Sequence, residues 1–406
     1  MLRRVAPLVL IACNGTRPTA HDAAPTPSAT TSSSVAAAPT PTREPETLPP
    51  PSGDGGAGLC TRLEGPVKLA RPGPFAASER MGFVDFYAND AGKPALAGSL
   101  RVTARAGQPA ITPPAASPAT TRALPPCAAA ATFAFCMNSA GEIRRYRLGP
   151  SLESDNFVAR ARPGGPVAAA TIAGRPLVVY TRDRTTSEGV VSEAWAETDD
   201  GAETRLSEDG AGATTLALAP HGAGAIAFYV DARRGMSPVH ARTMTLSPKL
   251  ALGKDAVVFI GGGAESHTRI AAGARDKTAL ALFPIAHDLS FGLAIVKVDA
   301  EPQTDAPVVW SDYPNGLDPA PVAVTSGSPK AFVARVRPSA PKFGSPRILE
   351  IGTIDASGAF ASLGVLETSG APRDLAIAGD GASGFVLAYS AGGSGWAEHL
   401  SCESAK

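Results

Sequence analysis

The chain has 406 residues, and its 37 basic and 37 acidic side chains give a net charge of zero. Nucleic-acid binders normally carry a basic excess, so this balance argues against binding to DNA, RNA or anionic membrane surfaces by broad electrostatics. Glycine and proline contribute 42 and 38 residues, and so many turn-forming residues argue against long helices.

The amino terminus has the features of an export signal. Arg3 and Arg4 are followed by the short apolar run 5–12, which ends at Cys13. A membrane-spanning helix needs roughly 20 apolar residues, so this run is too short to be one. We therefore predict that residues 1–12 are a signal peptide.

The four residues Leu10-Ile11-Ala12-Cys13 resemble the bacterial lipobox. The resemblance implies that the Cys13 thiol takes a diacylglycerol and becomes the first residue after cleavage; an ordinary secretory signal is the alternative. Each buried CH₂ of such a lipid contributes about 0.8 kcal/mol to anchoring. The expected location is the cell envelope, with the membrane as a partner through this lipid. Asn14 is not the aspartate that marks inner-membrane retention in enteric bacteria, which favours the outer membrane.

Residues 13–57 are predicted to be a disordered tether. Val35 and Leu48 are the only large aliphatic residues of 14–57, which consist mostly of Ala, Pro, Thr, Ser and Gly. Such a composition cannot bury enough apolar surface to offset the entropy of ordering. Its prolines favour an extended conformation of about 3.1 Å per residue, which suits a segment that holds a domain away from a membrane.

Residues 58–406 carry a repeat of about fifty residues. Short apolar, strand-like runs recur along the chain, and their anchor residues are Tyr87, Phe135, Tyr180, Tyr229, Phe283, Ala334 and Tyr389. Self-similarity at such a period is typical of repeat architectures. The spacing is too even for unrelated strands.

Each repeat is predicted to contain four strands. The clearest one has strand-like runs at 214–220, 225–231, 239–246 and 255–260. The last repeat ends before a fourth run, while a spare run, 61–70, precedes the first repeat. Four strands at this period indicate the blade of a β-propeller, and the spare run would complete the last blade.

The cysteines fit this closure. Without Cys13, four remain, and an even number in an exported chain suggests disulfides. Three pairings are possible, and free thiols are a further alternative. Cys127 and Cys136 are at hairpin range, which leaves Cys60 with Cys402. The latter bond would close a loop of more than 300 residues, and would stabilise the fold by about 4–5 kcal/mol.

From residue 58 onwards the chain resembles bacterial β-propeller lipoproteins, in its period and strand texture rather than in a family motif. The resemblance implies an all-β fold with one β-propeller of four-stranded blades, closed by the amino-terminal strand. Seven anchors favour seven blades. The irregular first repeat, 71–120, leaves six as an alternative, and a pair of sandwiches is a more distant one.

No motif for catalysis, metal or cofactor binding is found. The sequence lacks a Gly-x-Ser-x-Gly elbow, a His-Glu-x-x-His pair, a phosphate loop and a Cys-x-x-Cys motif. Gly-x-Gly-x-x-Gly occurs at 53–58 and 379–384, but neither copy links a strand to a helix as dinucleotide binding requires. We expect no catalytic residue, no metal and no cofactor, and we read 379–384 as a hairpin turn.

Charged residues concentrate in loops that a propeller brings to one face. In this fold the loops between second and third strands, and those between blades, open on the same side. The residues predicted to form a binding face there are Arg182, Asp183, Arg184, Asp231, Arg233, Arg234, Asp288 and Arg337. Solvation of ordinary loops is the simpler explanation, but any site is expected on this face.

Two functions follow from these features. The first is a non-catalytic envelope protein that presents a propeller face to another protein or to a polysaccharide. The second is an envelope hydrolase or lyase whose site is assembled on the same face from several blades, where local motifs do not reveal it. Carboxylates and a histidine converging over the central channel would favour the enzyme.

Overall fold

The computed structural model describes residues 46–47, 60–80, 82–102, 125–149, 152–187, 189–234, 237–247, 249–260, 270–287, 290–304, 308–313, 321–327, 330–340, 345–380 and 384–402. The chain divides into two units, 1–42 and 43–406, and every described residue belongs to the second. Cys13 and most of the predicted tether therefore lie outside the described residues.

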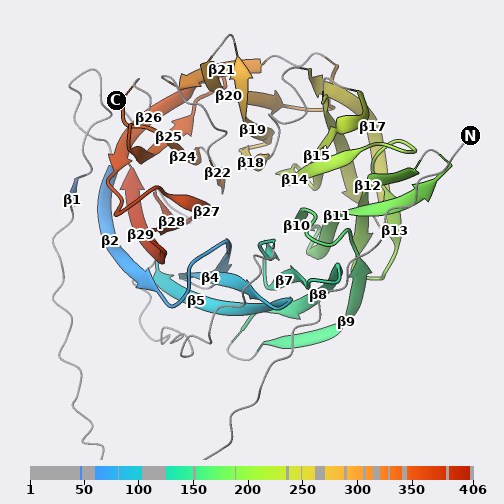
Figure 1. Cartoon of the computed structure of the whole chain (residues 1–406), viewed down its shortest axis with the longest axis horizontal. Helices are drawn as coiled ribbons and strands as arrows, with labels where there is room; N and C mark the ends of the chain where they lie inside the picture. The colour runs from blue at the N-terminus through green and yellow to red at the C-terminus, as the bar shows by residue number, and fades with distance from the viewer. Residues whose placement is uncertain are drawn as a thin grey trace, which may run out of the picture. The chain divides into compact units, whose positions relative to one another are not determined.

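The described residues form seven sheets, which we number as blades in chain order, and the strands of each blade pair antiparallel (Figure 1). The strands of blades 1 to 3 are β3 (Phe75–Arg80), β4 (Phe83–Asp90), β5 (Lys93–Arg101); β6 (Ala128–Ala130), β7 (Phe133–Met137), β8 (Glu142–Arg147), β9 (Glu153–Arg160); and β10 (Val167–Ile172), β11 (Arg175–Thr186), β12 (Gly189–Thr198), β13 (Glu203–Arg205).

Blades 4 to 7 complete the set. Their strands are β14 (Ala213–His221), β15 (Gly224–Asp231), β16 (Val239–Leu246), β17 (Leu250–Phe259); β18 (Ala271–Arg275), β19 (Thr278–His287), β20 (Ser290–Val298), β21 (Val308–Tyr313); β22 (Val322–Val324), β24 (Ala331–Pro338), β25 (Arg347–Ile354), β26 (Phe360–Leu366); and β27 (Arg373–Gly379), β28 (Gly384–Ala391), β29 (Ser394–Cys402), β2 (Cys60–Leu69). A short 3₁₀ helix, Ala232–Arg234, follows β15.

The seven blades close into a ring. The first strand of each blade contacts the first strand of the next, from β3 through β6, β10, β14, β18 and β22 to β27, and β27 contacts β3 again. Figure 1 shows these first strands around the centre and the later strands outside them. The prediction of a seven-bladed β-propeller is confirmed, and the six-bladed alternative is wrong.

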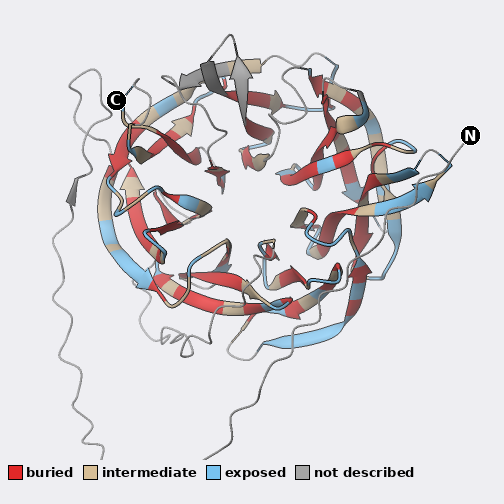
Figure 2. Cartoon of the chain, viewed as in Figure 1, coloured by how far each residue is buried: buried red, intermediate tan, exposed pale blue. Residues whose placement is uncertain are grey.

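The apolar runs of the repeat are the second strands. All seven anchor residues lie on β4, β7, β11, β15, β19, β24 and β28. Every residue of β15 and of β28 is buried, because a blade in a ring is covered on both faces by its neighbours (Figure 2). Strands buried on both faces read as continuous apolar runs rather than as alternating patterns.

The two ends of the propeller meet in blade 7. Strand β2 pairs antiparallel with β29, so the amino-terminal strand supplies the fourth strand that the last repeat lacks. Cys60 and Cys402 are direct partners in this ladder, and a disulfide joins them. Both the closure and the pairing are as predicted.

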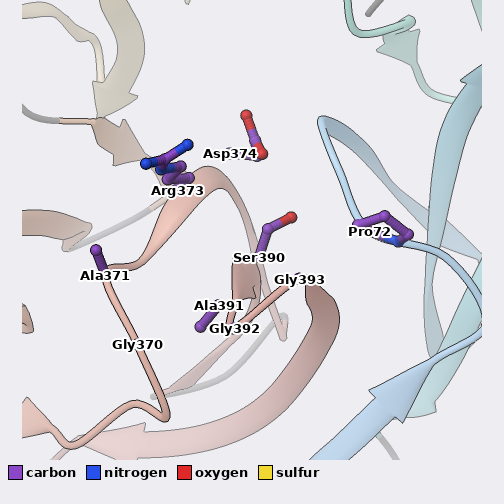
Figure 3. A pocket seen from close by; sticks show the side chains of 9 residues that line it. All are labelled: Pro72, Gly370, Ala371, Arg373, Asp374, Ser390, Ala391, Gly392 and Gly393. Atoms are coloured by element: carbon purple, nitrogen blue, oxygen red, sulfur yellow. The ribbon is translucent and has the colours of Figure 1, made fainter. Parts of the chain in front are cut away.

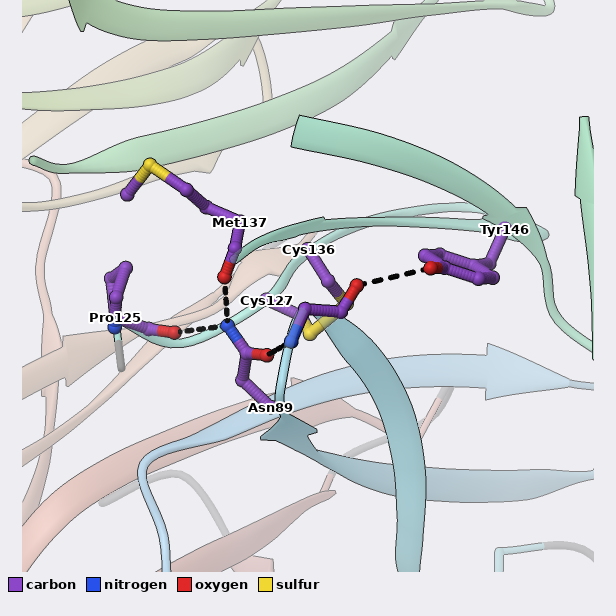
Figure 4. Close-up of a disulfide and its surroundings, with 7 residues drawn as sticks. Asn89, Pro125, Cys127, Cys136, Met137 and Tyr146 are labelled. Carbon is purple, nitrogen blue, oxygen red and sulfur yellow. Dashed lines mark hydrogen bonds between the residues drawn. A yellow bond between two sulfur atoms is a disulfide. The ribbon is translucent and has the colours of Figure 1, made fainter. Parts of the chain in front are cut away.

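The second disulfide, Cys127–Cys136, spans the β6–β7 hairpin, also as predicted. Figure 4 shows that Asn89 of blade 1 forms hydrogen bonds to this region. The Asn89 amide nitrogen donates to the carbonyl oxygens of Pro125 at 2.8 Å and Met137 at 2.9 Å. The end of β4 therefore fixes the segment that leads into blade 2.

Three details differ from the expected pattern. Blade 1 has three strands within the described residues. Strand β1 (Glu46–Thr47), within the segment predicted to be disordered, pairs with β2. Strand β23 (Ser326–Gly327) pairs in parallel with β18 of the neighbouring blade. The predicted turn at 379–384 does join two strands, β27 and β28.

Candidate functional site

A cavity of about 680 Å³ lies where the first strands of the ring begin. Its walls include Phe75 of β3, Val167 of β10 and Val322 of β22, which begin their strands, and Leu375, the third residue of β27. All seven blades contribute to it, either with the first strand or with the residues just before. We call this end of the ring the first-strand face.

The prediction that these charged residues lie in loops is wrong for most of them, because the second strands are longer than expected: Arg182, Asp183 and Arg184 lie in β11, Asp231 ends β15, and Arg337 lies in β24. The antiparallel ladders still bring these strand ends to the same face. Val167 at the start of β10 pairs with Tyr180, so β11 runs past the cavity wall and carries Arg182 beyond it. Val322 pairs with Arg335 in the same way, and Arg337 follows. The loops between second and third strands therefore open where the cavity does.

The cavity wall is made mostly of small, apolar and backbone-rich positions. Prolines and glycines before the first strands, together with alanines and threonines within them, make up much of the lining. Among the described residues that line it, Asp374 is the only ionisable one. Alanine and glycine dominate the first strands because neighbouring blades approach one another most closely near the ring axis.

A second pocket of about 440 Å³ adjoins the cavity at Asp374, which lines both. We call it the seam pocket, because Pro72 precedes blade 1 while its other lining residues belong to blade 7. Figure 3 shows Arg373, Asp374 and Ser390 projecting around it, with Pro72 across from them. Pockets of this size, with a few placed polar groups, are typical of small-ligand sites.

Arg373 and Asp374 are the charged groups of the seam pocket. Neither side chain has an ion pair or hydrogen bond to another described residue. Asp374 has a φ of 53°, in the left-handed region that residues other than glycine rarely adopt. A Cβ on Gly73 would lie 2.8 Å from the Asp374 Cβ, so the facing loop approaches as closely as only glycine allows.

Several of the predicted charged residues meet at the junction of blades 3 and 4. There Arg184 pairs with acids that were not predicted, and Arg233 pairs with the predicted Asp231. We call this group the junction cluster; its members are Arg184, Glu193, Arg205, Asp209, Asp231 and Arg233. Arg184 bonds to Asp209 and donates from Nε to the buried Glu193 carboxylate at 3.1 Å.

Asp231 is the buried anchor of the cluster on the blade 4 side. It is 1% exposed and accepts from the Arg233 guanidinium at 2.8 Å and from the Gly212 backbone N–H at 3.2 Å. Burial by itself would raise the pKa of Asp231, but these hydrogen bonds and the Arg233 charge outweigh it and lower the pKa. The Asp231 carboxylate therefore holds the beginning of the loop between β15 and β16 through its bonds to Arg233.

The other predicted residues are mostly engaged as well. Arg182 stacks on Trp195, with its guanidinium carbon 3.8 Å from the ring centroid, and forms an ion pair with Glu203 at 2.9 Å. Asp183 lies 3.9 Å from Arg162. Arg337 is 6% exposed and pairs with Glu350, so the structure places its side chain inside blade 6.

Two predicted residues cannot be placed as side chains. Arg234 ends the 3₁₀ helix, but only its backbone is described, and Asp288 lies outside the described residues. The residues that the sequence analysis missed are Arg373 and Asp374. Their position at the start of the last blade's first strand is the signal that would have selected them, since inter-blade loops open on this face.

A tyrosine–carboxylate bond recurs inside the blades. Tyr180 donates to Glu197 at 3.0 Å, and Tyr389 donates to Glu398 at 2.6 Å. The two pairs occupy matching register positions, because Tyr180 faces Trp195 and Tyr389 faces Trp396. Burial raises the pKa of both tyrosines. These buried acids brace second strands against third strands, away from the cavity.

Within the described part of the chain, no three His, Cys, Asp or Glu side chains are grouped to hold a metal ion. The same residues include no helix that is long and apolar enough to cross a bilayer. The histidines that lie near acids, His240 beside Asp255 and His399 beside Asp380, are buried within blades 4 and 7.

No family model and no curated protein matches this chain. Among solved structures, it is similar to an alpha-L-arabinanase of Penicillium chrysogenum, with 12% identity, a TM-score of 0.44, and coverage of 66% of this chain and 89% of that one. A fucose-specific lectin from Aleuria aurantia matches with 12% identity and a TM-score of 0.42, over 82% of this chain and 96% of the lectin. A structure described as the six-bladed fold of that lectin has 11% identity and a TM-score of 0.40, over 80% and 90% of the two chains.

Proposed function

We propose that this protein is a lipid-anchored, non-catalytic binding protein of the cell envelope that takes a glycan on its first-strand face. The observation that carries the proposal is the 680 Å³ cavity, to which all seven blades contribute, with the seam pocket beside it. Together they offer a long concave surface rich in backbone groups, threonine and proline. Backbone groups and threonine hydroxyls can form hydrogen bonds with the many hydroxyl groups of a glycan chain.

The distribution of exposed apolar side chains favours a glycan over a protein partner. The large hydrophobic side chains exposed among the described residues are Leu63, Val67, Leu152, Val158, Val190 and Ile260. None of them lines the cavity or the seam pocket. Protein interfaces usually carry exposed apolar or aromatic anchors at their centre, and the large apolar residues that line the cavity, such as Phe75 and Leu216, are buried or half-buried within their blades.

The titratable groups support binding rather than hydrolysis. Hydrolysis of a glycosidic bond ordinarily uses two carboxyl groups on either side of the bond. Asp374 is the only carboxylate among the described residues that line the cavity or the seam pocket, and no histidine lines either one. A pocket of about 660 Å³ that is rich in carboxylates, including Asp155, Glu197 and Asp199, lies at the β12–β13 turn, at the other end of blade 3 from the cavity. The second candidate function, an envelope hydrolase or lyase, would therefore need a site away from the first-strand face.

The test is binding of purified envelope polysaccharide to the domain, with a variant that fills the cavity. Thr214 is exposed at the cavity wall, so Thr214→Trp should weaken binding at least tenfold by occupying the mouth. Thr132 is exposed in the turn between β6 and β7, at the opposite end of the blade; Thr132→Trp is the matched control and should bind as the wild type does. Equal binding by both variants, or capture of an envelope protein in place of polysaccharide, would contradict the glycan assignment.

The anchor is tested separately. Cys13→Ser removes the thiol that the lipobox-like residues place at the cleavage point. We expect this variant to lose labelling by a fatty-acid analogue and to leave the membrane fraction or remain an unprocessed precursor. Unchanged lipid labelling would rule out lipidation at Cys13 and leave the binding proposal untouched.

A further inference from the structure

We propose that the seam pocket binds a carboxylated sugar unit, such as a uronic acid residue of a polysaccharide. This inference rests on the proposed function, since it names the kind of glycan and the position that selects it. The pocket adjoins the central cavity through Asp374, which lines both. A polysaccharide lying across the first-strand face can therefore occupy the two together.

Arg373 supplies the group that recognises the carboxylate. It is exposed at the pocket wall, and no acid among the described residues forms an ion pair with it. This sets it apart from Arg184 and Arg233 on the same face, which are bound to acids of the junction cluster. A guanidinium presents parallel N–H groups that match a carboxylate in a bidentate arrangement.

Asp374 and Ser390 supply the groups that recognise hydroxyls. An ionised carboxylate only accepts hydrogen bonds, and sugar hydroxyls donate them. The Ser390 Oγ accepts from the Gly73 backbone N–H at 2.7 Å, which leaves its own hydroxyl hydrogen to donate to a ligand oxygen. The site thus combines one cationic donor, one anionic acceptor and one neutral donor within a single pocket.

The backbone holds Asp374 in a sparsely populated conformation. Its φ of 53° and the close approach of Gly73 fix the carboxylate next to Arg373 although the two charges do not pair. Strained residues of this kind persist only where the surrounding structure over-determines them, and they are common at binding sites. Separating two adjacent opposite charges keeps both available to a ligand.

The composition of the pocket favours a sugar acid over an acidic peptide. An acidic peptide would satisfy Arg373 but would repel Asp374, because it offers carboxylates without hydroxyls. A sugar acid carries a carboxylate and vicinal hydroxyls on one rigid ring. The glycines of the β28–β29 turn leave the pocket floor open, since a Cβ on Gly393 would meet nothing within 4 Å.

The test compares an α-1,4-linked galacturonate trimer with its methyl ester, which keeps the hydroxyls and loses the negative charges. Titration of the wild-type protein should show at least tenfold tighter binding of the acid than of the ester. Arg373→Ala should weaken binding of the acid at least tenfold and change binding of the ester less than twofold. Arg373→Lys should fall between the wild type and Arg373→Ala, because it keeps the charge without the bidentate fork.

Asp374→Asn tests the hydroxyl contacts with the uncharged ester. Asparagine tolerates the left-handed backbone, so the fold is preserved while one acceptor oxygen is replaced by a donor. We expect at least threefold weaker binding of the ester. The control is Arg175→Ala, which removes the same charge from the β10–β11 end of blade 3, far from the pocket, and should change neither affinity.

Three results would overturn this inference. They are equal binding of acid and ester by the wild type, equal losses of both in Arg373→Ala, and binding of a hexaglutamate peptide as tight as that of the trimer. If Arg373→Ala has no effect while Thr214→Trp still abolishes polysaccharide binding, the seam assignment fails and the proposed function stands. If both variants bind every glycan as the wild type does, the proposed function fails with it.

Discussion

Two junctions between neighbouring blades are built on different principles. At the junction of blades 3 and 4, Arg184 and Arg205 form ion pairs with Glu193 and Asp209. Arg233 pairs with Asp231 and joins the two groups by donating to the Asp209 backbone carbonyl. Beside the seam of blades 7 and 1, the chain ends are held within blade 7 by the β2–β29 ladder and the Cys60–Cys402 disulfide, with one ion pair across that ladder and one from Arg71 to blade 1. There Arg373 and Asp374 have no partner among the described residues.

The difference separates structural charges from available ones. A charge whose partner is already within hydrogen-bond distance must break that bond before it binds a ligand, so the junction cluster is expected to contribute to stability. The seam is stabilised by backbone pairing, a disulfide and the ion pairs Arg62–Glu398 and Arg71–Asp90. None of these uses Arg373 or Asp374, which leaves those two charges available for another role. Charge density on a face is therefore a poor guide to a site unless the pairing is known.

The largest expected effect on stability comes from removing the disulfide beside the seam. Replacing both Cys60 and Cys402 by serine restores the entropy of a loop of 342 residues to the unfolded chain. The expected loss in the free energy of unfolding is about 5 kcal/mol. The same double replacement at Cys127 and Cys136, which are nine residues apart, should cost only about 2.5 kcal/mol.

Denaturant titration of both double variants under oxidising conditions measures these costs. The order of the two losses is the decisive result, because both pairs are buried and only the loop length differs strongly. A smaller loss for the Cys60–Cys402 pair would mean that the β2–β29 ladder alone sets the stability of the closure.

An intermediate effect on stability is expected when an ion pair of the junction cluster is removed. Glu193→Gln removes the carboxylate that Arg184 and Arg205 share, and should lower the free energy of unfolding by about 2 kcal/mol. Glu203→Gln is the control, because its pair with Arg182 is partly exposed and exposed pairs contribute about 0.5 kcal/mol. Glycan affinity should remain unchanged in both variants, and a loss in Glu193→Gln alone would place the cluster in the binding site.

The smallest effect is a difference in pH dependence. The pKa of Asp231 is lowered in the folded protein, so the folded state holds this proton less tightly than the unfolded state does. Its contribution to stability is therefore complete above the unfolded pKa and is lost as the pH falls through the folded pKa, which lies below 3.8. Asp231→Asn should flatten the fall in unfolding free energy between pH 5 and the acid limit.

Urea titrations at several pH values measure that slope. Loss of the closing disulfide should leave the slope as it is, because disulfide-bonded cysteines do not titrate. An unchanged acid slope in Asp231→Asn would show that other carboxylates control the acid limit.

The fold could be predicted from the sequence because its signals are local or periodic. Tyr87, Tyr229 and Tyr389 mark second strands that are buried on both faces, and such strands leave continuous apolar runs. The missing fourth strand of the last repeat and the spare strand at 61–70 predicted the closure, and the cysteine positions agreed with it. Strands β1 and β23 gave no such signal, because two-residue strands depend on a neighbouring edge rather than on their own pattern.

For the candidate site, the sequence predicted the face of the propeller on which it lies but not the residues that form it. The order of strands in a blade fixes where Arg182 and Asp231 lie, but it says nothing about their partners. Arg337 illustrates the limit, since it was expected in the loop after the second strand and instead lies within β24, buried against Glu350. Arg373 and Asp374 begin β27 on the same face and were passed over, because the sequence does not show that they lack partners.

The sequence by itself determined the repeat of about fifty residues and the strand that closes the ring, and it favoured seven blades and the two disulfides. These features depend on hydrophobic period, strand count and cysteine positions, while the structure decided against six blades and showed the register that pairs Cys60 with Cys402. Only the tertiary structure decided which charges are engaged and which are free. That outcome depends on contacts between residues far apart in the chain, such as Gly73 against Asp374, and no local pattern encodes those distances.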